Sequence, residues 1–114
     1  MTGTEPATPA KSRPVLVTLP AEIDLANAHT VREKLTAAFA PGALVIADMT
    51  ATRYCDSQGI RALVTAHDQA TASGAVLRVV ISSQAVQRVM NIMKVNTMLH
   101  IYPTIDEALP DGAE

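Results

Sequence analysis

A regular alternation of short apolar runs with helical patterns limits the fold of this chain more than any other feature. The run at residues 43–47 is wholly apolar and lacks the polar–apolar alternation of a half-exposed strand. Such runs are typical of strands that are covered on both faces, as in a parallel sheet. Further runs at residues 15–19, 76–81 and 98–102 complete a set of four predicted strands.

Four helices are predicted from residues that favour helix N-termini. Their expected starting points are Asp24, then Asp56 or Ser57, then Ser82 or Ser83, then Pro103 with Thr104. In the first helix, Leu25 and Ala28 open a stripe of apolar residues spaced by three and four, which predicts a buried face. The order βαβαβαβα predicts an α/β fold: an open, mostly parallel or mixed sheet of four to five strands with about four helices. If the sheet has a fifth strand, we expect it in residues 4–12.

The length of 114 residues indicates one domain with a core of its own. Residues 1–12 are rich in Thr, Pro and Ala and carry no periodic apolar pattern, so we expect a flexible N-terminal tail there. We expect residues 13–114 to form the single folded domain.

Composition argues against several classes of function. The net charge of −2 and the aromatic content of 3% disfavour direct binding of nucleic acid. A single cysteine excludes an intramolecular disulfide and a multi-cysteine metal site. No apolar run approaches the ~20 residues that span a bilayer, and the first residues carry no signal-peptide pattern. We therefore expect a cytoplasmic protein without membrane insertion.

The stretch from Asp48 to Ile60 most strongly indicates a site. It connects a predicted buried strand to a helix, and in open α/β sheets ligands bind at the carboxyl ends of strands. A helix N-terminus has unpaired N–H groups and favours negative charge, so Ser57 is a suitable place to hold a phosphate. Gly59 leaves room for a partner to approach closely, and Arg61 stands where it can position that phosphate. The same residues also fit an ordinary helix cap.

Catalytic and metal-binding roles have less support. Ser57 and His67 lie about 15 Å apart along one predicted helix, too far to form a catalytic pair. The three histidines show no metal-ligand spacing. Cys55 stands beside Asp56, which disfavours a reactive thiolate, so we expect a structural cysteine. Because the chain has no glycine-rich phosphate loop, we expect no cofactor.

Three parts of the chain resemble the STAS domain family, which includes anti-sigma factor antagonists and the cytoplasmic tails of sulphate transporters. They are residues 21–25 (AEIDL), residues 45–49 (VIADM) with residues 56–60 (DSQGI), and residues 83–89 (SQAVQRV). Their order and spacing extend the resemblance over residues 14–109. It implies a STAS-like sheet with helices packed against it.

The resemblance also implies a function. Ser57 stands at the position where bacterial antagonists of this family are phosphorylated by an anti-sigma factor that is itself a kinase. The unphosphorylated protein binds the anti-sigma factor and releases the sigma factor, and a serine phosphatase resets the phosphorylated form. The implied partner surface comprises Asp24, Asp56, Ser57, Gln58, Gly59 and Arg61. ATP belongs to the kinase and not to this chain.

Two other functions remain open at this point. One is a STAS module that scaffolds a sensory complex or regulates a membrane transporter, with Ser57 only a helix cap. The other is a small α/β enzyme that uses the same crevice. The sequence also leaves homodimer formation open.

Overall fold

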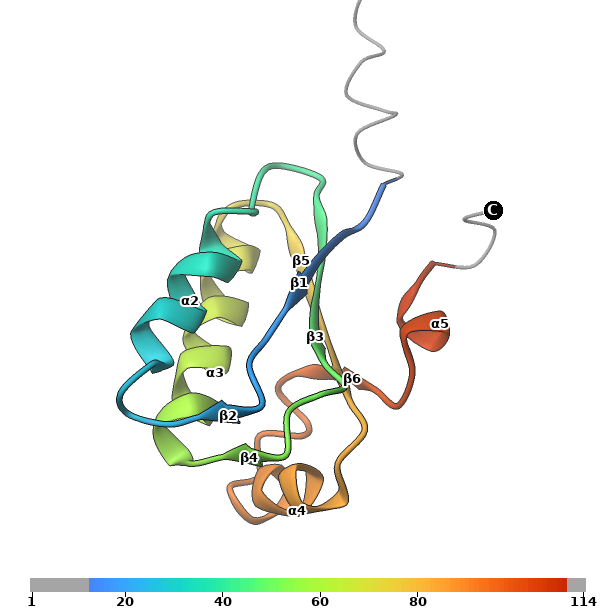
Figure 1. Cartoon of the computed structure of the whole chain (residues 1–114). Helices are drawn as coiled ribbons and strands as arrows, with labels where there is room; N and C mark the ends of the chain where they lie inside the picture. Colours follow the sequence, from blue (N-terminus) through green and yellow to red (C-terminus); the bar gives the residue numbers. More distant parts are fainter. Residues whose placement is uncertain (1–12, 111–114) are drawn as a thin grey trace, which may run out of the picture.

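The computed structural model describes residues 13–110. The predicted N-terminal tail and the fifth strand sought in residues 4–12 lie outside the described residues, as do the last four residues of the predicted domain. Within the described part, a central sheet with helices on both sides forms one α/β unit (Figure 1).

The central sheet has four parallel strands, and their spatial order is β1-β3-β5-β6. Their bounds are β1 Val15–Thr18, β3 Leu44–Met49, β5 Val76–Ile81 and β6 His100–Tyr102. The prediction of four strands in a parallel sheet is therefore confirmed. Strand β3 ends at Met49 and is longer than predicted, because its hydrogen-bonded pairing with β5 continues to Ile81.

Helices cover the two faces of the sheet unequally. Their bounds are α2 Ala28–Thr36, α3 Ser57–Ala72, α4 Gln84–Ile92 and α5 Ile105–Ala108. Helices α2 and α3 lie side by side on one face, the short α5 lies against the other, and α4 lies beyond the carboxyl ends of the strands (Figure 1). The predicted caps of the last two helices are confirmed, since Ser83 accepts a hydrogen bond from the Val86 N–H and Thr104 from the Glu107 N–H.

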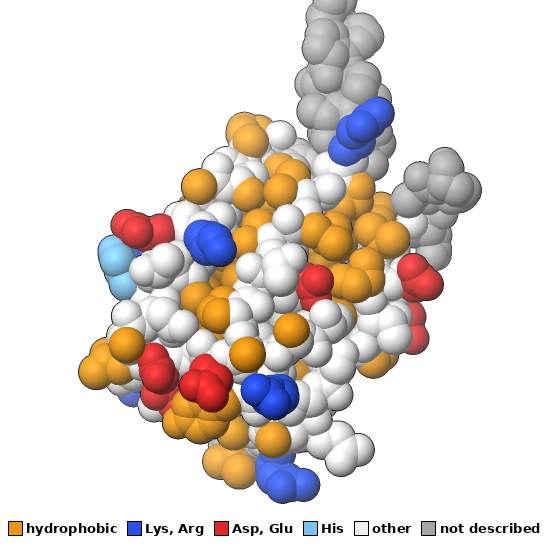
Figure 2. Space-filling view, in the orientation of Figure 1, with side chains coloured by type: hydrophobic (Ala, Val, Ile, Leu, Met, Phe, Trp, Pro, Cys, Tyr) orange, Lys and Arg blue, Asp and Glu red, His pale blue; other side chains and the backbone are white. Residues whose placement is uncertain are grey.

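The main core lies between the sheet and the pair α2/α3. Val45, Ala47 and Met49 of β3 are fully buried and face this layer. On the opposite face, Ile46 packs with Val80 and with Ala108 of α5. The run at residues 43–47 has no polar alternation because β3 is buried from both sides. Leu16 remains 48% exposed on the edge strand β1, where apolar side chains gather between β1 and α5 (Figure 2).

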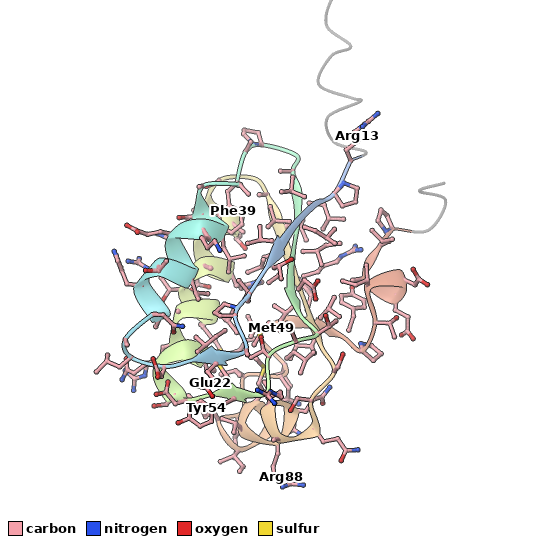
Figure 3. The ribbon with its side chains drawn as sticks, viewed as in Figure 1. Arg13, Glu22, Phe39, Met49, Tyr54 and Arg88 are labelled. Carbon is pink, nitrogen blue, oxygen red and sulfur yellow. The ribbon has the colours of Figure 1, made fainter. Side chains whose placement is uncertain are left out.

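A second, two-stranded sheet was not predicted. Strand β2 covers Glu22–Ile23 and pairs in parallel with β4, which covers Tyr54–Cys55. Glu22 lies opposite Tyr54, and Figure 3 shows the two side chains next to each other. Strands of two residues are too short for a hydrophobic period to appear in the sequence.

The predicted start of the first helix at Asp24 is wrong. Helix α2 begins at Ala28, and the residues before it form a turn in which the Asp24 carbonyl accepts the Ala28 N–H at 2.8 Å. Asn27 holds that turn, because its side chain accepts the Asp24 N–H and donates to the Glu22 carbonyl, each at 2.9 Å. Leu25, expected in the buried stripe, therefore lies in the turn and is 73% exposed.

Candidate functional site

Two loops that are distant in sequence form the candidate site, and backbone hydrogen bonds join them. The Arg53 N–H donates to the Ala21 carbonyl at 2.8 Å, and the Asp56 N–H donates to the Ile23 carbonyl at 3.0 Å. The buried Thr52 hydroxyl adds a bond of 2.7 Å to the Pro20 carbonyl. These contacts extend the β2–β4 pairing on both sides. They place the turn that follows β2 beside the start of α3.

Gly59 has a different role from the one predicted. It is buried in the first turn of α3, so a partner cannot reach it. A Cβ atom at this position would lie 2.6 Å from Cys55 Sγ and 2.7 Å from Ile23 Cγ2. The glycine therefore allows α3 to lie against the β2–β4 pair. The close approach that it permits is internal to the domain.

Cys55 is a structural cysteine, as predicted. It is 2% exposed, and burial, followed by the nearby charge of Asp56, raises the pKa of its thiol to about 12. The thiol is therefore neutral near pH 7 and is a poor nucleophile and a poor metal ligand. Its contribution is to fill the space between β4 and the first turn of α3.

Asp56 caps α3, as predicted. Its Oδ1 accepts the N–H groups of Gln58 at 2.9 Å and of Gly59 at 3.1 Å. These bonds satisfy two of the donors that a helix N-terminus leaves unpaired. They also change the expectation for Ser57, because a phosphate there would find those two donors already engaged and a carboxylate beside it.

The exposed side chains at the start of α3 are Ser57, Gln58 and Arg61. Ser57 and Arg61 are four residues apart, which places them on one helix face about 6 Å apart along the axis. Gln58 and Arg61 also line a groove between α3 and α2, together with Leu25 from the preceding turn. Asp24 is half-buried in that turn, and its Oδ1 accepts the Ala26 N–H at 2.9 Å.

The structure brings no metal-ligand set together within residues 13–110, where no group of three or more His, Cys, Asp or Glu residues could hold a metal ion. The rings of His67 and His100 approach each other edge to face, with centroids 5.5 Å apart. A larger groove of about 530 Å³ lies elsewhere, along α4, where Gln84, Gln87, Arg88 and Asn91 line it. Arg88 extends outward at that end of the molecule (Figure 3).

The comparisons with known proteins bear on the whole domain. A family model of the STAS domain matches residues 5–108. The chain belongs to the STAS domain family. The match begins before the domain boundary predicted at residue 13. No curated protein matches the sequence.

Solved structures show the same STAS fold. An anti-sigma factor antagonist from Mycobacterium paratuberculosis is 23% identical, with a TM-score of 0.73 over 82% of this chain and 80% of that one. A protein from Thermotoga maritima, proposed to be an anti-sigma factor antagonist, is 20% identical, with a TM-score of 0.67 over 82% and 83%. A sulfate transporter family protein from Wolinella succinogenes is 17% identical, with a TM-score of 0.73 over 84% and 81%.

Two residues that shape this STAS surface, Asn27 and Arg32, were missed in the sequence, and a third, Leu25, was wrongly placed in a buried helical stripe. Asn27 holds the turn after β2, Leu25 is exposed in it, and Arg32 of α2 lines the groove facing α3. The sequence carries a signal for Asn27, since asparagine favours turns and helix starts. Nothing in the sequence separates Leu25 from the helical stripe that Ala28 and Val31 continue.

Proposed function

We propose that this STAS domain is an anti-sigma factor antagonist, and that phosphorylation of Ser57 switches off its binding to a kinase-type anti-sigma factor. One observation carries the proposal. Ser57 is exposed at the first residue of α3, on the surface where the turn after β2 meets the start of that helix. A kinase can reach this hydroxyl without unfolding the domain, and a partner bound over the surface would cover it.

The electrostatics of the site support a switch. A phosphate on Ser57 adds about −1.5 to −2 charges next to Asp56, whose carboxylate already accepts two N–H groups of the helix start. The phosphate would therefore extend into the partner surface instead of withdrawing into the helix terminus. Arg61, one turn further along α3, is the cation best placed to pair with it. A loss of a few kcal/mol at the interface would weaken binding about a hundredfold or more.

The proposal also defines the other participants. The kinase supplies ATP, a serine phosphatase resets the domain, and this chain needs no cofactor. The switch operates in the cytoplasm, through protein contacts and not through DNA. Within residues 13–110, no helix combines the length and the apolar character needed to cross a membrane. Similarity in fold to anti-sigma factor antagonists supports this reading, and STAS family membership favours regulation over catalysis.

Phosphosite mass spectrometry tests the proposal. The protein is mixed with ATP and each purified anti-sigma kinase of the source organism, and binding is measured by calorimetry before and after the reaction. We expect phosphate on Ser57 alone and a loss of binding of at least about a hundredfold. Ser57→Ala is the control: it should keep its fold and its binding, and it should take up no phosphate. Persistent binding by the Ser57-phosphorylated protein would overturn the switch.

Regulation of a membrane transporter is the second candidate, and the similarity to the Wolinella sulfate transporter family protein favours it. In that case Ser57 is only part of the helix start, and the partner is a permease. Affinity purification of the tagged full chain from solubilised membranes separates the two functions. Recovery of a sulfate permease, with no anti-sigma kinase bound, would replace the first proposal with this one.

A further inference from the structure

The groove between α2 and α3 has a consistent charge pattern. It has a volume of about 270 Å³, and its charged side chains are Arg32 from α2 and Arg61 from α3. His29 and Gln58 add polar groups, and the remaining lining consists of Leu25, two alanines and a threonine. No carboxylate belongs to this lining. Two guanidinium groups from facing helices therefore border one small depression.

Hydrogen bonds direct one of these guanidinium groups. Arg32 Nη2 lies 3.0 Å from His29 Nδ1, and His29 Nε2 lies 3.0 Å from Glu33 Oε2. Both contacts are satisfied when the imidazole accepts from the arginine at Nδ1 and donates to the glutamate at Nε2. The three side chains, from two consecutive turns of α2, form a short polar chain that runs from Glu33 through His29 to Arg32 at the groove.

The nearby carboxylates of Asp24, Glu33 and Asp56 lie outside the groove lining, and each already has a hydrogen-bond or ion-pair partner. Asp24 Oδ1 accepts the Ala26 N–H, and Asp56 Oδ1 accepts two N–H groups at the start of α3. Leu25 adds a large apolar side chain at the rim, 73% exposed. Arginine is enriched among the residues that carry most of the binding energy in protein interfaces, and the exposed Leu25 side chain offers apolar surface that a partner can bury next to the two arginines.

We propose that this groove receives a carboxylate side chain of the anti-sigma factor, held between Arg32 and Arg61, while an apolar neighbour of that carboxylate packs on Leu25. The inference rests on the proposed function and specifies its partner: an acidic residue beside an apolar one on the docking surface. Arginine pairs with carboxylates through two parallel hydrogen bonds, which fixes orientation as well as charge.

The groove also explains how one phosphate can release the partner. Ser57 lies one helical turn from Arg61, so a phosphate on Ser57 competes with the incoming carboxylate for the same guanidinium. The phosphate and the carboxylate, both next to Arg61, also repel each other. Release then follows from competition at Arg61 and does not require a change of fold.

Calorimetric titration of the full chain with the purified anti-sigma factor tests the groove. We expect Arg61→Gln and Arg32→Gln each to weaken binding about fivefold, and Arg61→Glu to weaken it at least about thirtyfold. Leu25→Ala should weaken it about tenfold. Arg88→Gln on α4 removes another exposed arginine, away from this groove, and should leave the affinity unchanged. Salt should weaken the wild type more than Arg61→Gln.

The outcomes separate this inference from the proposed function. If the wild type binds no anti-sigma factor, the proposed function is wrong, and the groove inference, which names the anti-sigma factor as the bound partner, is wrong with it. If the wild type binds and the groove variants bind equally well, the antagonist function stands and the groove inference is wrong. If the arginine variants instead turn a dimer into a monomer, as measured by light scattering, a second copy of this chain occupies the groove and the inference is overturned.

Discussion

The turn that leads into α2 and the loop that leads into α3 look alike in sequence and differ in structure. Each has an aspartate after a short apolar segment, at Asp24 and at Asp56, and each was predicted to cap a helix. Only Asp56 does so, through two hydrogen bonds, with Cys55 and Gly59 buried around it. Asp24 supports a turn, and the residue after it is the exposed Leu25.

The two loops of the site therefore differ in how they are held: one by buried packing, the other mainly by hydrogen bonds within an exposed turn. The start of α3 packs through the buried Cys55 and Gly59 against the β2–β4 pair, and Ser57 lies next to these contacts. The turn before α2 lacks such contacts and presents side chains to the outside. Under the proposed function, a phosphate acceptor on the packed helix start beside exposed side chains of the turn would suit a switch, because phosphorylation would change the charge of the surface without changing its shape.

The largest effect expected from this comparison is that of Gly59→Ala. The added methyl group would meet Cys55 Sγ and Ile23 Cγ2 at less than 3 Å, so either α3 or the β2–β4 pair must move. We expect a loss of about 1–3 kcal/mol in the free energy of unfolding, measured by urea denaturation. Adding Cys55→Ala should restore part of the loss, because it removes the nearest obstacle. No recovery in the double variant would contradict the packing described.

Replacement of the two aspartates gives a smaller and unequal effect. Asp56→Ala leaves two N–H groups of α3 without their acceptor, and we expect it to cost about 1 kcal/mol. Asp24→Ala removes one exposed contact and should cost less than about 0.5 kcal/mol. Asp56→Asn, which keeps an accepting oxygen, serves as the control. If thermal melts showed equal losses of stability for Asp56→Ala and Asp24→Ala, Asp56 would not be the stronger support of its loop.

Near neutral pH the smallest effect is that of Cys55 ionisation, which grows only above pH 9. The pKa of the Cys55 thiol is about 12 in the folded protein and 9.0 without burial, so the unfolded chain loses this proton at lower pH than the folded one does. Cys55 should therefore lower stability progressively as the pH rises from 9 toward 12 and have no such effect below 9. Melting of wild type and Cys55→Ala between pH 7 and 10.5 isolates this contribution. A pH-independent difference in melting temperature would contradict it.

Sequence reasoning predicted the central sheet well because its signals are local. The run at residues 43–47, the caps at Asp56, Ser83 and Thr104, and the break after α3 all depend on neighbouring residues. The β2–β4 pair was missed because each strand has two residues and its partner lies about thirty positions away. Gly59 leaves room for that pair. Because the pair was not predicted, the glycine was interpreted from the sequence as leaving room for a partner protein.

The groove was beyond sequence reasoning for a similar reason. Arg32 and Arg61 stand on different helices, and only the packing of α2 against α3 brings them to one depression. Arg61 was singled out through its spacing from Ser57, whereas Arg32 had no neighbour in sequence to mark it. The identity of Ser57 as the phosphate acceptor stays a prediction, because exposure permits modification without demonstrating it.

The pairing of β2 with β4 also has a consequence for hydrogen exchange. Each strand contributes two residues, so this pair can separate in a local opening that leaves the four-stranded sheet intact. The amide proton of Asp56, which is bonded to the Ile23 carbonyl, becomes exchangeable in that opening. A partner that binds across both loops would hold them closed and slow the exchange of the amide protons that join them, those of Arg53 and Asp56. Hydrogen exchange at the Asp56 amide would therefore report whether a partner is bound, without a label attached to the binding surface.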